Sequence, residues 1–386
     1  MAENKDKKVL NVPALRFPEF TDEWKKEQLG DIADFSKGAG ISKEQLSEKG
    51  EPCILYGELY TKYKSEVIYD IISKTDIDST KSVRSQANDV IIPSSGETAE
   101  DIATARCVLK NNILLGGDLN IIRLHKHSGS FMSYQLNGKR KYDIAKVAQG
   151  VSVVHLYAEH LKGVNTYNPC MEEQEKIARL LALLDERIAT QNKIIEDLKK
   201  LKSAISLKML HSDSWEQFRI KDIAIIGRGR VISSVEISQQ KNPTYPVYSS
   251  QTSNEGIMGY LDDYMFEGEY ISWTTDGANA GTVFYRNGRF NCTNVCGLLK
   301  LKKGFDTHFV SLVLAEATKK YVSVNLANPK LMNNTMGNIQ ICLPKLEEQK
   351  RISIVFRRLH ELLAIHNNLL TEYSKQKQYL LSQMFI

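Results

Sequence analysis

The stretch Asn168-Pro169-Cys170-Met171-Glu172-Glu173-Gln174-Glu175-Lys176-Ile177 returns 175 positions later as Leu343-Pro344-Lys345-Leu346-Glu347-Glu348-Gln349-Lys350-Arg351-Ile352. After each copy, apolar residues recur in a heptad stripe about three positions wide. Proline is tolerated just before a helix, and paired glutamates suit the positive end of the helix dipole. We therefore expect two long helices, over residues 172–210 and 347–385. Each would be about 58 Å long at ~1.5 Å per residue.

A second repeat precedes each predicted helix. The residues Trp24, Asp31-Ile32-Ala33, Gly38 and Ile41-Ser42 return 191 positions later as Trp215, Asp222-Ile223-Ala224, Gly229 and Ile232-Ser233. The chain is thus two half-proteins in tandem, in the order globule, helix, globule, helix. The difference between the two displacements (191 − 175 = 16) indicates that the first globule is longer than the second by about that many residues.

Both globules show short apolar runs broken by turn residues, a pattern typical of a mixed α+β fold. Buried strands are expected at 90–93, 113–116, 119–123, 270–273, 281–285 and 296–301, and helices at 44–49, 131–135 and 306–321. We expect four parts: a first domain with an N-terminal polar tail (1–168), a first long helix (169–211), a second domain (212–343) and a second long helix (344–386).

An apolar stripe of this length needs a partner, and the two helices can provide it for each other. Their heptads have the same phase, since 175 is a multiple of seven, which favours an antiparallel coiled coil. Each stripe is interrupted at its midpoint, by Gln191 in the first helix and by His366 in the second. We expect these two residues to meet and to set the register of the pair. The alternative is that both merely tolerate solvent at a loosely packed position.

Composition excludes several classes of protein. No run of about 18 apolar residues is present, so no membrane span is expected. The polar start, Met1-Ala2-Glu3-Asn4-Lys5, does not resemble a signal peptide, and a cytoplasmic location is expected. Six scattered cysteines do not form a disulfide pattern, and Cys292 and Cys296 are better interpreted as buried thiols than as metal ligands. The net charge of +5 is compatible with nucleic-acid binding but does not require it.

The duplicated Pro-x-x-Glu-Glu-Gln helix start and the duplicated Trp…Asp-Ile-Ala opening resemble the specificity subunit of type I restriction–modification systems. The segments Gly150–Leu156 and Asn328–Asn333, which precede the two helices, are also similar to that family. The resemblance covers essentially the whole chain. Its specificity lies in the order of the duplicated elements, since none of them is specific alone.

The resemblance implies two target-recognition domains, each of which reads one half of a split, asymmetric site in double-stranded DNA. The helices would form an antiparallel spacer and dock two methyltransferase subunits, and two motor-nuclease subunits would complete the complex. S-adenosylmethionine, ATP and Mg²⁺ are then expected on these partners, and no cofactor, metal or catalytic residue on this chain.

The residues themselves agree that catalytic signatures are missing. No G-x-x-x-x-G-K-[ST] phosphate loop is present, and no glycine-rich loop stands convincingly between a strand and a helix. The segment Asn242-Pro243-Thr244-Tyr245 is similar to the N-P-P-Y signature of adenine methyltransferases. It lacks the second proline, and we interpret it as a turn. The rival interpretation of the whole chain is a coiled-coil adaptor with two binding modules that do not bind DNA.

Bases are read mainly by polar and basic side chains on exposed loops. Both repeats carry clusters of polar residues in similar places, and we predict that these clusters form the DNA-contacting loops. The alternative for any one residue is an ordinary solvated turn. The candidate DNA-contacting residues are Lys37, Lys43, Tyr60, Lys62, Ser94, Ser95, Thr98, Arg228, Arg230, Ser250, Gln251, Thr252, Asn254, Thr274 and Thr275.

Overall fold

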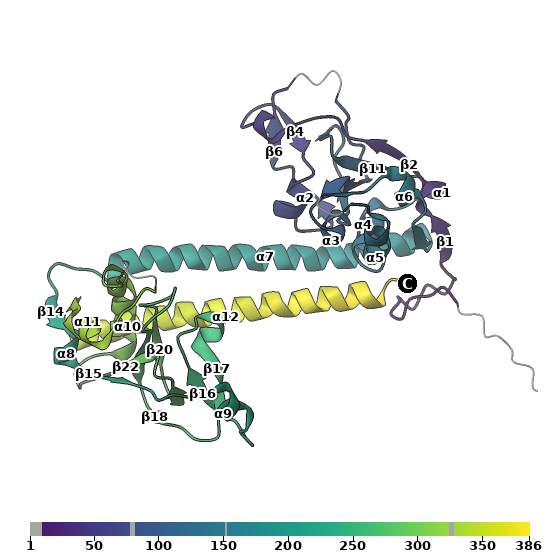
Figure 1. The fold of residues 1–386 in the computed structure, drawn as a ribbon. Helices are drawn as coiled ribbons and strands as arrows, with labels where there is room; N and C mark the ends of the chain where they lie inside the picture. The colour runs from purple at the N-terminus through teal and green to yellow at the C-terminus, as the bar shows by residue number, and fades with distance from the viewer. Residues whose placement is uncertain (1–9, 78–81, 151–152, 324–327) are drawn as a thin grey trace, which may run out of the picture. The chain divides into compact units, whose positions relative to one another are not determined.

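The chain divides into two compact units in the computed structural model, which describes residues 10–77, 82–150, 153–323 and 328–386. Unit 1 comprises Met1–Lys193 and Asn367–Ile386, and unit 2 comprises Ile194–His366. Each unit therefore holds one globular domain together with one end of each long helix (Figure 1). Residues 1–9 of the expected tail and residues 151–152 of the segment Gly150–Leu156 lie outside the described residues.

The first domain, in unit 1, is a mixed α/β globule built on two main sheets. Their strand orders are β2-β11-β7-β9-β5 and β10-β4-β6-β3. The β-branched run at 90–92 makes β7 a central strand that is buried along its whole length. The elements are β1 (Lys25–Gln28), α1 (Leu29–Ile32), β2 (Ala33–Lys37), η1 (Lys43–Gln45), β3 (Leu46–Ser47), β4 (Glu51–Ile54), α2 (Glu58–Thr61), β5 (Val67–Ile68), β6 (Ser73–Thr75), β7 (Asp89–Pro93), β8 (Ser95–Gly96), α3 (Ala99–Ile102), β9 (Arg106–Val108), β10 (Leu114–Leu115), β11 (Leu119–Leu124), α4 (Gly129–Asn137), α5 (Lys141–Val147), β12 (Val154–His155), α6 (Ala158–Lys162) and β13 (Asn165–Asn168).

The second domain, in unit 2, repeats this plan with a shorter chain. Its main sheets have the orders β15-β22-β19-β20 and β17-β16-β21-β18. The elements are β14 (Glu216–Arg219), α8 (Ile220–Ile223), β15 (Ala224–Arg228), α9 (Ser234–Ser238), β16 (Tyr245–Tyr248), η3 (Ser253–Gly256), β17 (Ile257–Leu261), β18 (Phe266–Glu267), β19 (Tyr270–Thr274), β20 (Val283–Arg286), β21 (Arg289–Cys292), β22 (Cys296–Leu301), α10 (Thr307–Ala317), η4 (Thr318–Lys320), α11 (Asn333–Asn338) and β23 (Gln340–Leu343).

The cores of the two domains match in detail. Trp24 contacts Phe131 edge-on, with ring centroids 5.8 Å apart at 67°, and Trp215 meets Phe309 with the same distance and angle. The repeated tryptophans thus anchor equivalent aromatic pairs on α4 and α10.

The expected strands and the expected helices at 131–135 and 306–321 are present, but the helix expected at 44–49 is wrong. A short 3₁₀ turn, η1, occupies 43–45, and Leu46 and Ser47 then pair with Thr75 and Lys74 of β6. Sheet pairing overrides the local helical pattern there, because a helix of one turn has little stability of its own.

The long helices are α7 (Met171–Met209) and α12 (Leu346–Gln383), and the repeated glutamine ties each to its domain. Gln174 donates from Nε2 to the carbonyl oxygen of Pro169 at 2.9 Å, and its Oε1 accepts the backbone N–H of Ser128 at 3.0 Å. Gln349 repeats both bonds, to the proline carbonyl of its own copy at 2.8 Å and to the N–H of Asp306 at 3.0 Å. Ser128 and Asp306 are the N-caps of α4 and α10, so one buried amide joins the long helix to a domain helix.

The end of the chain and the segment before Trp24 also pack in unit 1. The cluster around Trp24 includes Met384 and Phe385 together with Ile177 and Leu181 of α7. Glu173 of α7 makes a bidentate ion pair with Arg16, both bonds at 2.7 Å. Within the segment expected to be a polar tail, Arg16 and Phe17 therefore pack against α7, whereas Leu10, Val12 and Leu15 are exposed.

The predicted apolar stripe of the long helices is wider than the part of it that is buried. In α7, Ile177, Leu181, Leu184 and Ile195 are buried. Other members of the predicted stripe are substantially exposed, namely Leu201, Val355, Leu362 and Leu369. These side chains lie at the margins of the stripe, where a single helix partner cannot cover them.

A polar junction lies between the helix segments of unit 1. Asp185 of α7 accepts hydrogen bonds from the Tyr134 hydroxyl at 2.6 Å and from Ser65 Oγ at 2.9 Å. It also forms an ion pair with Lys377 of α12, which pairs in turn with Glu66. The two acids offset the charge of the buried ammonium group.

The same two helix positions form a different junction in unit 2. The displacement of 175 carries Asp185 to His360 and Lys202 to Lys377, and here Lys202 of α7 bonds His360 of α12, with Nζ and Nε2 2.6 Å apart. His308 of α10 lies against His360 with ring centroids 5.9 Å apart, and its Nδ1 is 2.9 Å from Ser353 Oγ. This junction therefore gathers nitrogen bases where unit 1 has an acid–base pair.

Gln191 belongs to unit 1 and His366 to unit 2. Their meeting at the middle of the helix pair stays a prediction.

The histidine junction predicts that unit 2 loses stability in mild acid. Burial, together with the nearby charges of Arg357 and His360, lowers the pKa of His308 to about 4. In the unfolded chain the imidazole of His308 is protonated below pH ~6.5, whereas in the folded chain it stays neutral down to about pH 4. The contribution of His308 to stability is therefore complete above pH ~6.5 and falls as the pH drops towards 4. We expect a loss of up to about 3 kcal/mol in the free energy of unfolding, measured by urea denaturation from pH 7 to 4.

The control is His308→Gln, whose amide can still bond Ser353 but does not titrate. The difference between the two proteins should appear between pH 6.5 and 4. Equal acid sensitivity of both would show that His308 is not responsible.

Candidate functional site

Both domains build the same turn after their first sheet strand. Lys37 ends β2 and Arg228 ends β15, at repeat-equivalent positions, and Gly38 or Gly229 follows. A Cβ at Gly38 would lie 2.0 Å from the carbonyl oxygen of Gly116, and one at Gly229 only 1.6 Å from that of Cys292. Only glycine lets the backbone pass so close to the neighbouring segment. In each domain the turn ends at a serine, Ser42 or Ser233, which is the N-cap residue of the next short helix, η1 or α9.

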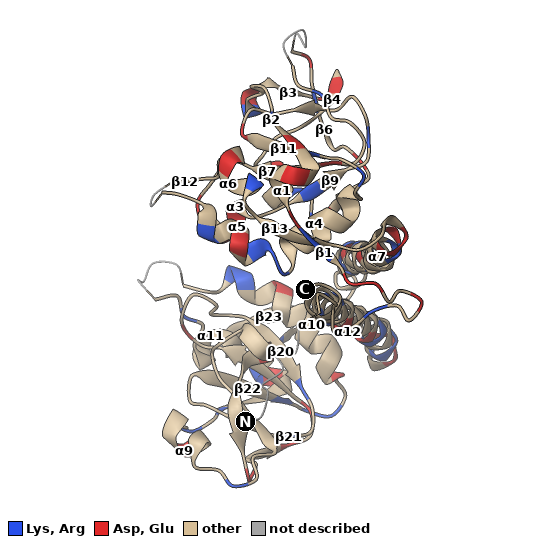
Figure 2. Ribbon diagram, turned by 90° about the vertical axis from the view of Figure 1, so that its right-hand side faces the viewer, with Lys and Arg blue, Asp and Glu red and all other residues tan. Residues whose placement is uncertain are grey.

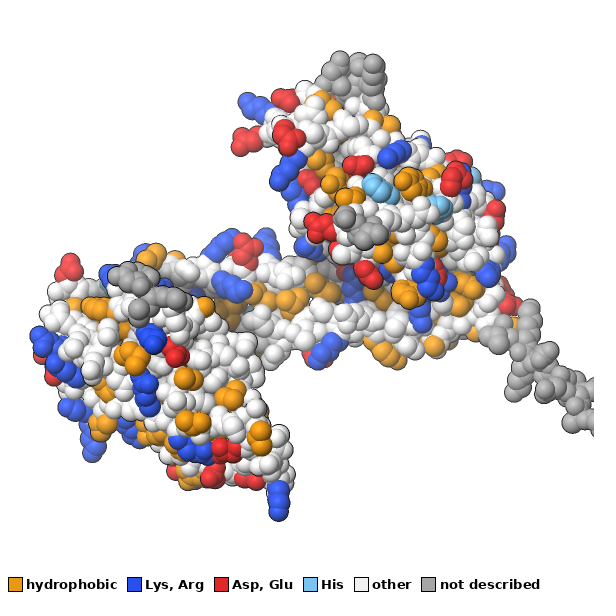
Figure 3. Space-filling model, viewed as in Figure 1, with side chains coloured by type: hydrophobic (Ala, Val, Ile, Leu, Met, Phe, Trp, Pro, Cys, Tyr) orange, Lys and Arg blue, Asp and Glu red, His pale blue; other side chains and the backbone are white. Residues whose placement is uncertain are grey.

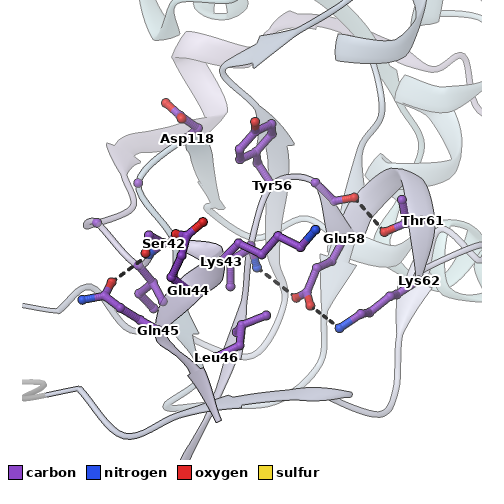
Figure 4. A pocket seen from close by; sticks show the side chains of 16 residues that line it. Ser42, Lys43, Glu44, Gln45, Leu46, Tyr56, Glu58, Thr61, Lys62 and Asp118 are labelled. Atoms are coloured by element: carbon purple, nitrogen blue, oxygen red, sulfur yellow. Dashed lines mark hydrogen bonds and ion pairs between the residues drawn. The ribbon is translucent and has the colours of Figure 1, made fainter.

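Below this turn, the first domain contains a pocket of about 760 Å³. The segments 40–46, 55–58, 61–62 and 116–118 line it, and they include the candidates Lys43 and Lys62. Figure 4 shows the side chain of Lys43 extending from η1 towards α2, with Tyr56 and Asp118 on another side of the pocket. Two of the loops chosen from sequence therefore face one cavity.

The two lysines in this pocket differ in their availability. Lys62 Nζ bonds Glu58 Oε1 at 2.7 Å and Ser73 Oγ at 2.6 Å, and Glu58 also accepts the backbone N–H of Leu55 at 3.0 Å. Lys62 is thus engaged in holding α2 to the sheet. Lys43 is exposed, and no ion pair or hydrogen bond of its ammonium group occurs among the described residues. Its charge can meet an anionic ligand at no cost in existing contacts.

Tyr60 and the Ser94–Thr98 segment adjoin the pocket. The Tyr60 hydroxyl is buried and has no hydrogen-bond partner within the described part of the chain, and burial raises its pKa. A Cβ on Gly96 would lie 3.3 Å from that oxygen, so Tyr60 contacts the second candidate loop. A buried hydroxyl without a partner is costly.

The three candidates of the second loop have distinct structural duties. Ser94 is buried, and its backbone N–H donates to the carbonyl oxygen of Asp118 at 2.9 Å. Ser95 pairs with His155 in a two-stranded ladder. Thr98 is exposed and caps α3 by accepting the N–H of Asp101 at 3.1 Å. Of these three, Thr98 presents the most accessible side chain.

In the second domain, the side chains of Thr274 and Thr275 stabilise the loop through internal hydrogen bonds and do not face solvent. Both are buried; Thr274 Oγ1 donates to the carbonyl oxygen of Thr282 at 3.2 Å, and Thr275 Oγ1 to that of Val295 at 2.9 Å. The sheet pairing places Thr275 after β19 where Ser94 follows β7. The two loops are therefore equivalent in the fold.

The two candidate arginines are also engaged. Arg228 donates from Nε to Asn333 Oδ1 at 2.9 Å, and Arg230 forms an exposed ion pair with Glu236. Asn333 is not among the predicted site residues, although it is the last residue of the segment Asn328–Asn333, which resembles the family. Its amide fixes the direction of Arg228.

Four candidates lie on the segment Ser249–Gly256, which joins β16 to β17. Gln251 bonds the carbonyl oxygen of Ile257 through its amide, whereas Ser250, Thr252 and Asn254 have no side-chain bond among the described residues. Asn254 and Glu255 have positive φ angles of 48° and 52°. Such strain in non-glycine residues is characteristic of functional loops.

Charge does not mark the site by itself. Figure 2 shows acidic and basic residues interspersed along the ribbon of each domain, and Figure 3 shows both kinds of side chain on the visible face. Any attraction to a polyanion must therefore come from local groups such as Lys37 and Lys43.

Other features point to no further chemistry. In the described ranges no group of three or more His, Cys, Asp or Glu side chains is placed to hold a metal ion. Cys292 and Cys296 are buried thiols on β21 and β22, as expected. Asn242, Pro243 and Thr244 form a bend and an irregular segment before β16, which begins at Tyr245, and the N–H of Asn242 donates to Asp262 Oδ1 at 2.8 Å. Across the described residues, no helix is long and apolar enough to cross a membrane.

Comparison with known proteins gives consistent results. The model of the type I restriction modification DNA specificity domain matches twice, at residues 21–200 and 212–373. A putative type I specificity subunit of Mycoplasma pneumoniae is 38% identical over 198 residues, which cover 50% of this chain and 82% of the relative. The specificity subunit of the type I restriction enzyme MpnII of the same organism is 43% identical over 150 residues, 38% of this chain and 44% of the relative.

The fold is also similar to solved structures. The S subunit of a type I restriction–modification system from M. genitalium matches with a TM-score of 0.73 at 18% identity, covering 97% of this chain and 99% of that one. At this identity the similarity concerns the fold alone.

The close backbone approach at Gly229 predicts that adding a methyl group there destabilises the protein, whereas adding one at Gly227 does not. Gly229→Ala should lower the free energy of unfolding by about 1–3 kcal/mol, because the new Cβ overlaps the Cys292 carbonyl and the backbone must shift. Gly227→Ala is the matched control, since nothing lies within 4 Å of its Cβ position. Urea denaturation of both variants measures the effect, and equal stabilities would contradict the close approach.

Proposed function

The chain belongs to the type I restriction modification DNA specificity family, and on that basis we propose that it is the non-catalytic DNA-reading subunit of a type I restriction–modification complex. Its two domains would each recognise one half of a bipartite, asymmetric site in double-stranded DNA. In this proposal residues 1–168 and 212–343 are the two target-recognition domains, and 169–211 and 344–386 form the spacer.

The observation that carries the proposal is the combination of equal folds and unequal loops. The two domains share the order of four strands in the first main sheet and the glycine turn that ends at a serine. Equivalent loop positions nevertheless differ: Lys37 corresponds to Arg228, Lys43 to Ser234, and Ser94 to Thr275. A common scaffold with different loop side chains is what reading two different sequences requires.

The best-placed contacts follow from exposure and free bonding capacity. Lys37 and Lys43 in the first domain, and Ser250, Thr252 and Asn254 in the second, have accessible and uncommitted polar groups. Thr98 is exposed, but its hydroxyl is already bonded to Asp101. Lys62, Thr274 and Thr275 are already engaged in internal bonds, and we propose that they shape the loops. Arg228, oriented by Asn333, would contact DNA through the donors that this bond leaves free.

The helices would act as an antiparallel coiled coil that sets the distance between the domains. Support comes from each unit separately: α7 and α12 share the Asp185–Lys377 ion pair in unit 1 and the Lys202–His360 bond in unit 2. In both units the start of one helix lies beside the end of the other. The exposed apolar side chains Leu201, Leu362 and Leu369 provide surface on which methyltransferase subunits can dock.

S-adenosylmethionine, ATP and Mg²⁺ would belong to the partner subunits, two methyltransferases and two motor-nucleases. The competing proposal is an adaptor whose helices pair but whose domains do not bind DNA. The exposed leucines are compatible with it, and the unequal polar loops favour DNA reading.

The deciding experiment is genome-wide mapping of N6-methyladenine. The chain would be co-expressed with its methyltransferase subunit in a host that lacks other modification. A methylated motif with two defined half-sites and a degenerate gap of fixed length is expected. An assembled complex that leaves the genome unmethylated, or that methylates a contiguous motif, would overturn the proposal.

Insertion of one heptad into each helix tests the spacer. An antiparallel pair about 58 Å long should separate the half-sites by roughly 10–17 base pairs, at ~3.4 Å of DNA axis per base pair. The insertion should lengthen the degenerate gap by about three base pairs, since seven residues add about 10 Å. Both half-sites should keep their sequences. Altered half-sites would mean that the helices themselves read bases.

A further inference from the structure

Each domain contains a buried arginine on the fourth strand of its main sheet. Arg106 on β9 is 9% exposed and Arg286 on β20 is 4% exposed. Burial lowers the pKa of both guanidinium groups, which expresses the cost of removing the charge from water. A residue kept at such a cost is expected to make bonds that the fold needs.

Arg286 holds the candidate recognition loop of the second domain. Its terminal NH2 nitrogen donates to the carbonyl oxygen of Glu255 at 2.7 Å, and its Nε donates to Ser272 Oγ at 2.9 Å. The guanidinium carbon lies 3.6 Å from the ring centroid of Tyr248 and 4.4 Å from that of Phe284. The side chain thus connects the sheet to the strained part of the segment Ser249–Gly256, where Glu255 has a positive φ.

Arg106 makes the corresponding bonds in the first domain. Its Nε donates to the carbonyl oxygen of Tyr63 at 3.2 Å, and a terminal nitrogen donates to that of Leu59 at 3.4 Å. These carbonyls belong to α2 and to the residues just after it, the segment that carries Tyr60 and Lys62 and lines the pocket. A buried guanidinium again sets the position of a candidate loop through its backbone.

The two arginines occupy related places in the sheet. Along the equivalent strand orders β2-β11-β7-β9 and β15-β22-β19-β20, the pairings align Arg286 with Val108, and Arg106 with Phe284. Their positions are two residues apart along the strand, and therefore on the same face. Their sequence separation matches neither repeat displacement, so only the sheet register relates them.

We propose that Arg286 and Arg106 are positioning residues for DNA recognition, each of which fixes the shape of one recognition loop and so the base preference of one half-site. The inference rests on the proposed function and deepens it. Neither arginine needs to touch DNA, because each acts through the backbone of a loop whose side chains do. Lysine cannot replace either one, since an ammonium group lacks the planar fork that bonds two acceptors at fixed angles.

The test compares Arg286→Lys and Arg106→Lys in the full chain co-expressed with the methyltransferase subunit. N6-methyladenine mapping gives the frequency of every base in each half-site. For Arg286→Lys, discrimination against single-base mismatches should fall by at least about fivefold in one half-site, the lower end of what one base pair contributes. The other half-site should be unchanged, and Arg106→Lys should show the reverse pattern.

Arg16→Lys is the control for a merely structural loss. Arg16 is also a partly buried arginine with a bidentate bond, to Glu173, but it lies outside both loop clusters. Its variant should lower stability while leaving both half-sites intact. Thermal unfolding of all three variants shows how far each one is destabilised.

The outcomes separate the two proposals. A wild-type complex without a bipartite motif removes the proposed function. A normal wild-type motif, with arginine variants that lose total methylation uniformly and keep both half-sites, overturns the positioning role alone. Relaxation of both half-sites by either variant would also overturn it, because each arginine contacts a loop of one domain.

Discussion

The attachment of each long helix to its own domain is the constraint on which the rest of the structure depends. A buried glutamine amide, Gln174 or Gln349, bonds a proline carbonyl at the helix start and the N-cap N–H of a domain helix. Both partners are backbone groups that burial would otherwise leave unsatisfied. The orientation of the helix relative to the sheet is therefore set within its first turn, in both repeats.

The loops are likewise held mainly through contacts with backbone atoms. In each domain a glycine allows the chain to pass against a neighbouring carbonyl, a serine caps the next turn, and a buried arginine holds a second loop. These devices involve backbone atoms almost exclusively, so they leave the loop side chains free to vary. A scaffold of this kind can present Lys43 in one domain and Asn254 in the other without any change of fold.

The two helix junctions show how duplicated positions can diverge. Asp185 and Lys377 form a buried ion pair in unit 1, whereas His360 and Lys202 at the equivalent positions in unit 2 form a bond between two nitrogen bases. The first stabilises a charge by an opposite charge, and the second requires the imidazole to remain neutral. The same two helix positions thus hold an ion pair in unit 1 and an imidazole in unit 2, and burial lowers the pKa of that imidazole.

The sequence by itself determined the duplication, the two long helices and most of the strands, because these depend on periodic patterns of apolar residues and on local signals such as the Pro-x-x-Glu-Glu-Gln start. It also identified loops that the fold brings to equivalent places. It did not predict that 44–49 would be only a turn followed by a strand, that Arg16 and Phe17 pack on α7, or that Leu201 and Leu362 stay exposed.

Only the tertiary structure decided which polar residues are free. Lys62, Thr274 and Thr275 look like binding residues in the sequence, yet they are bonded internally. Arg106 and Arg286 carry no sequence signal, and the sequence does not indicate that Asn333 orients Arg228. The physical reason is that hydrogen bonds to distant backbone carbonyls arise from the meeting of strands far apart in the chain. A local pattern of residues contains no information about that meeting.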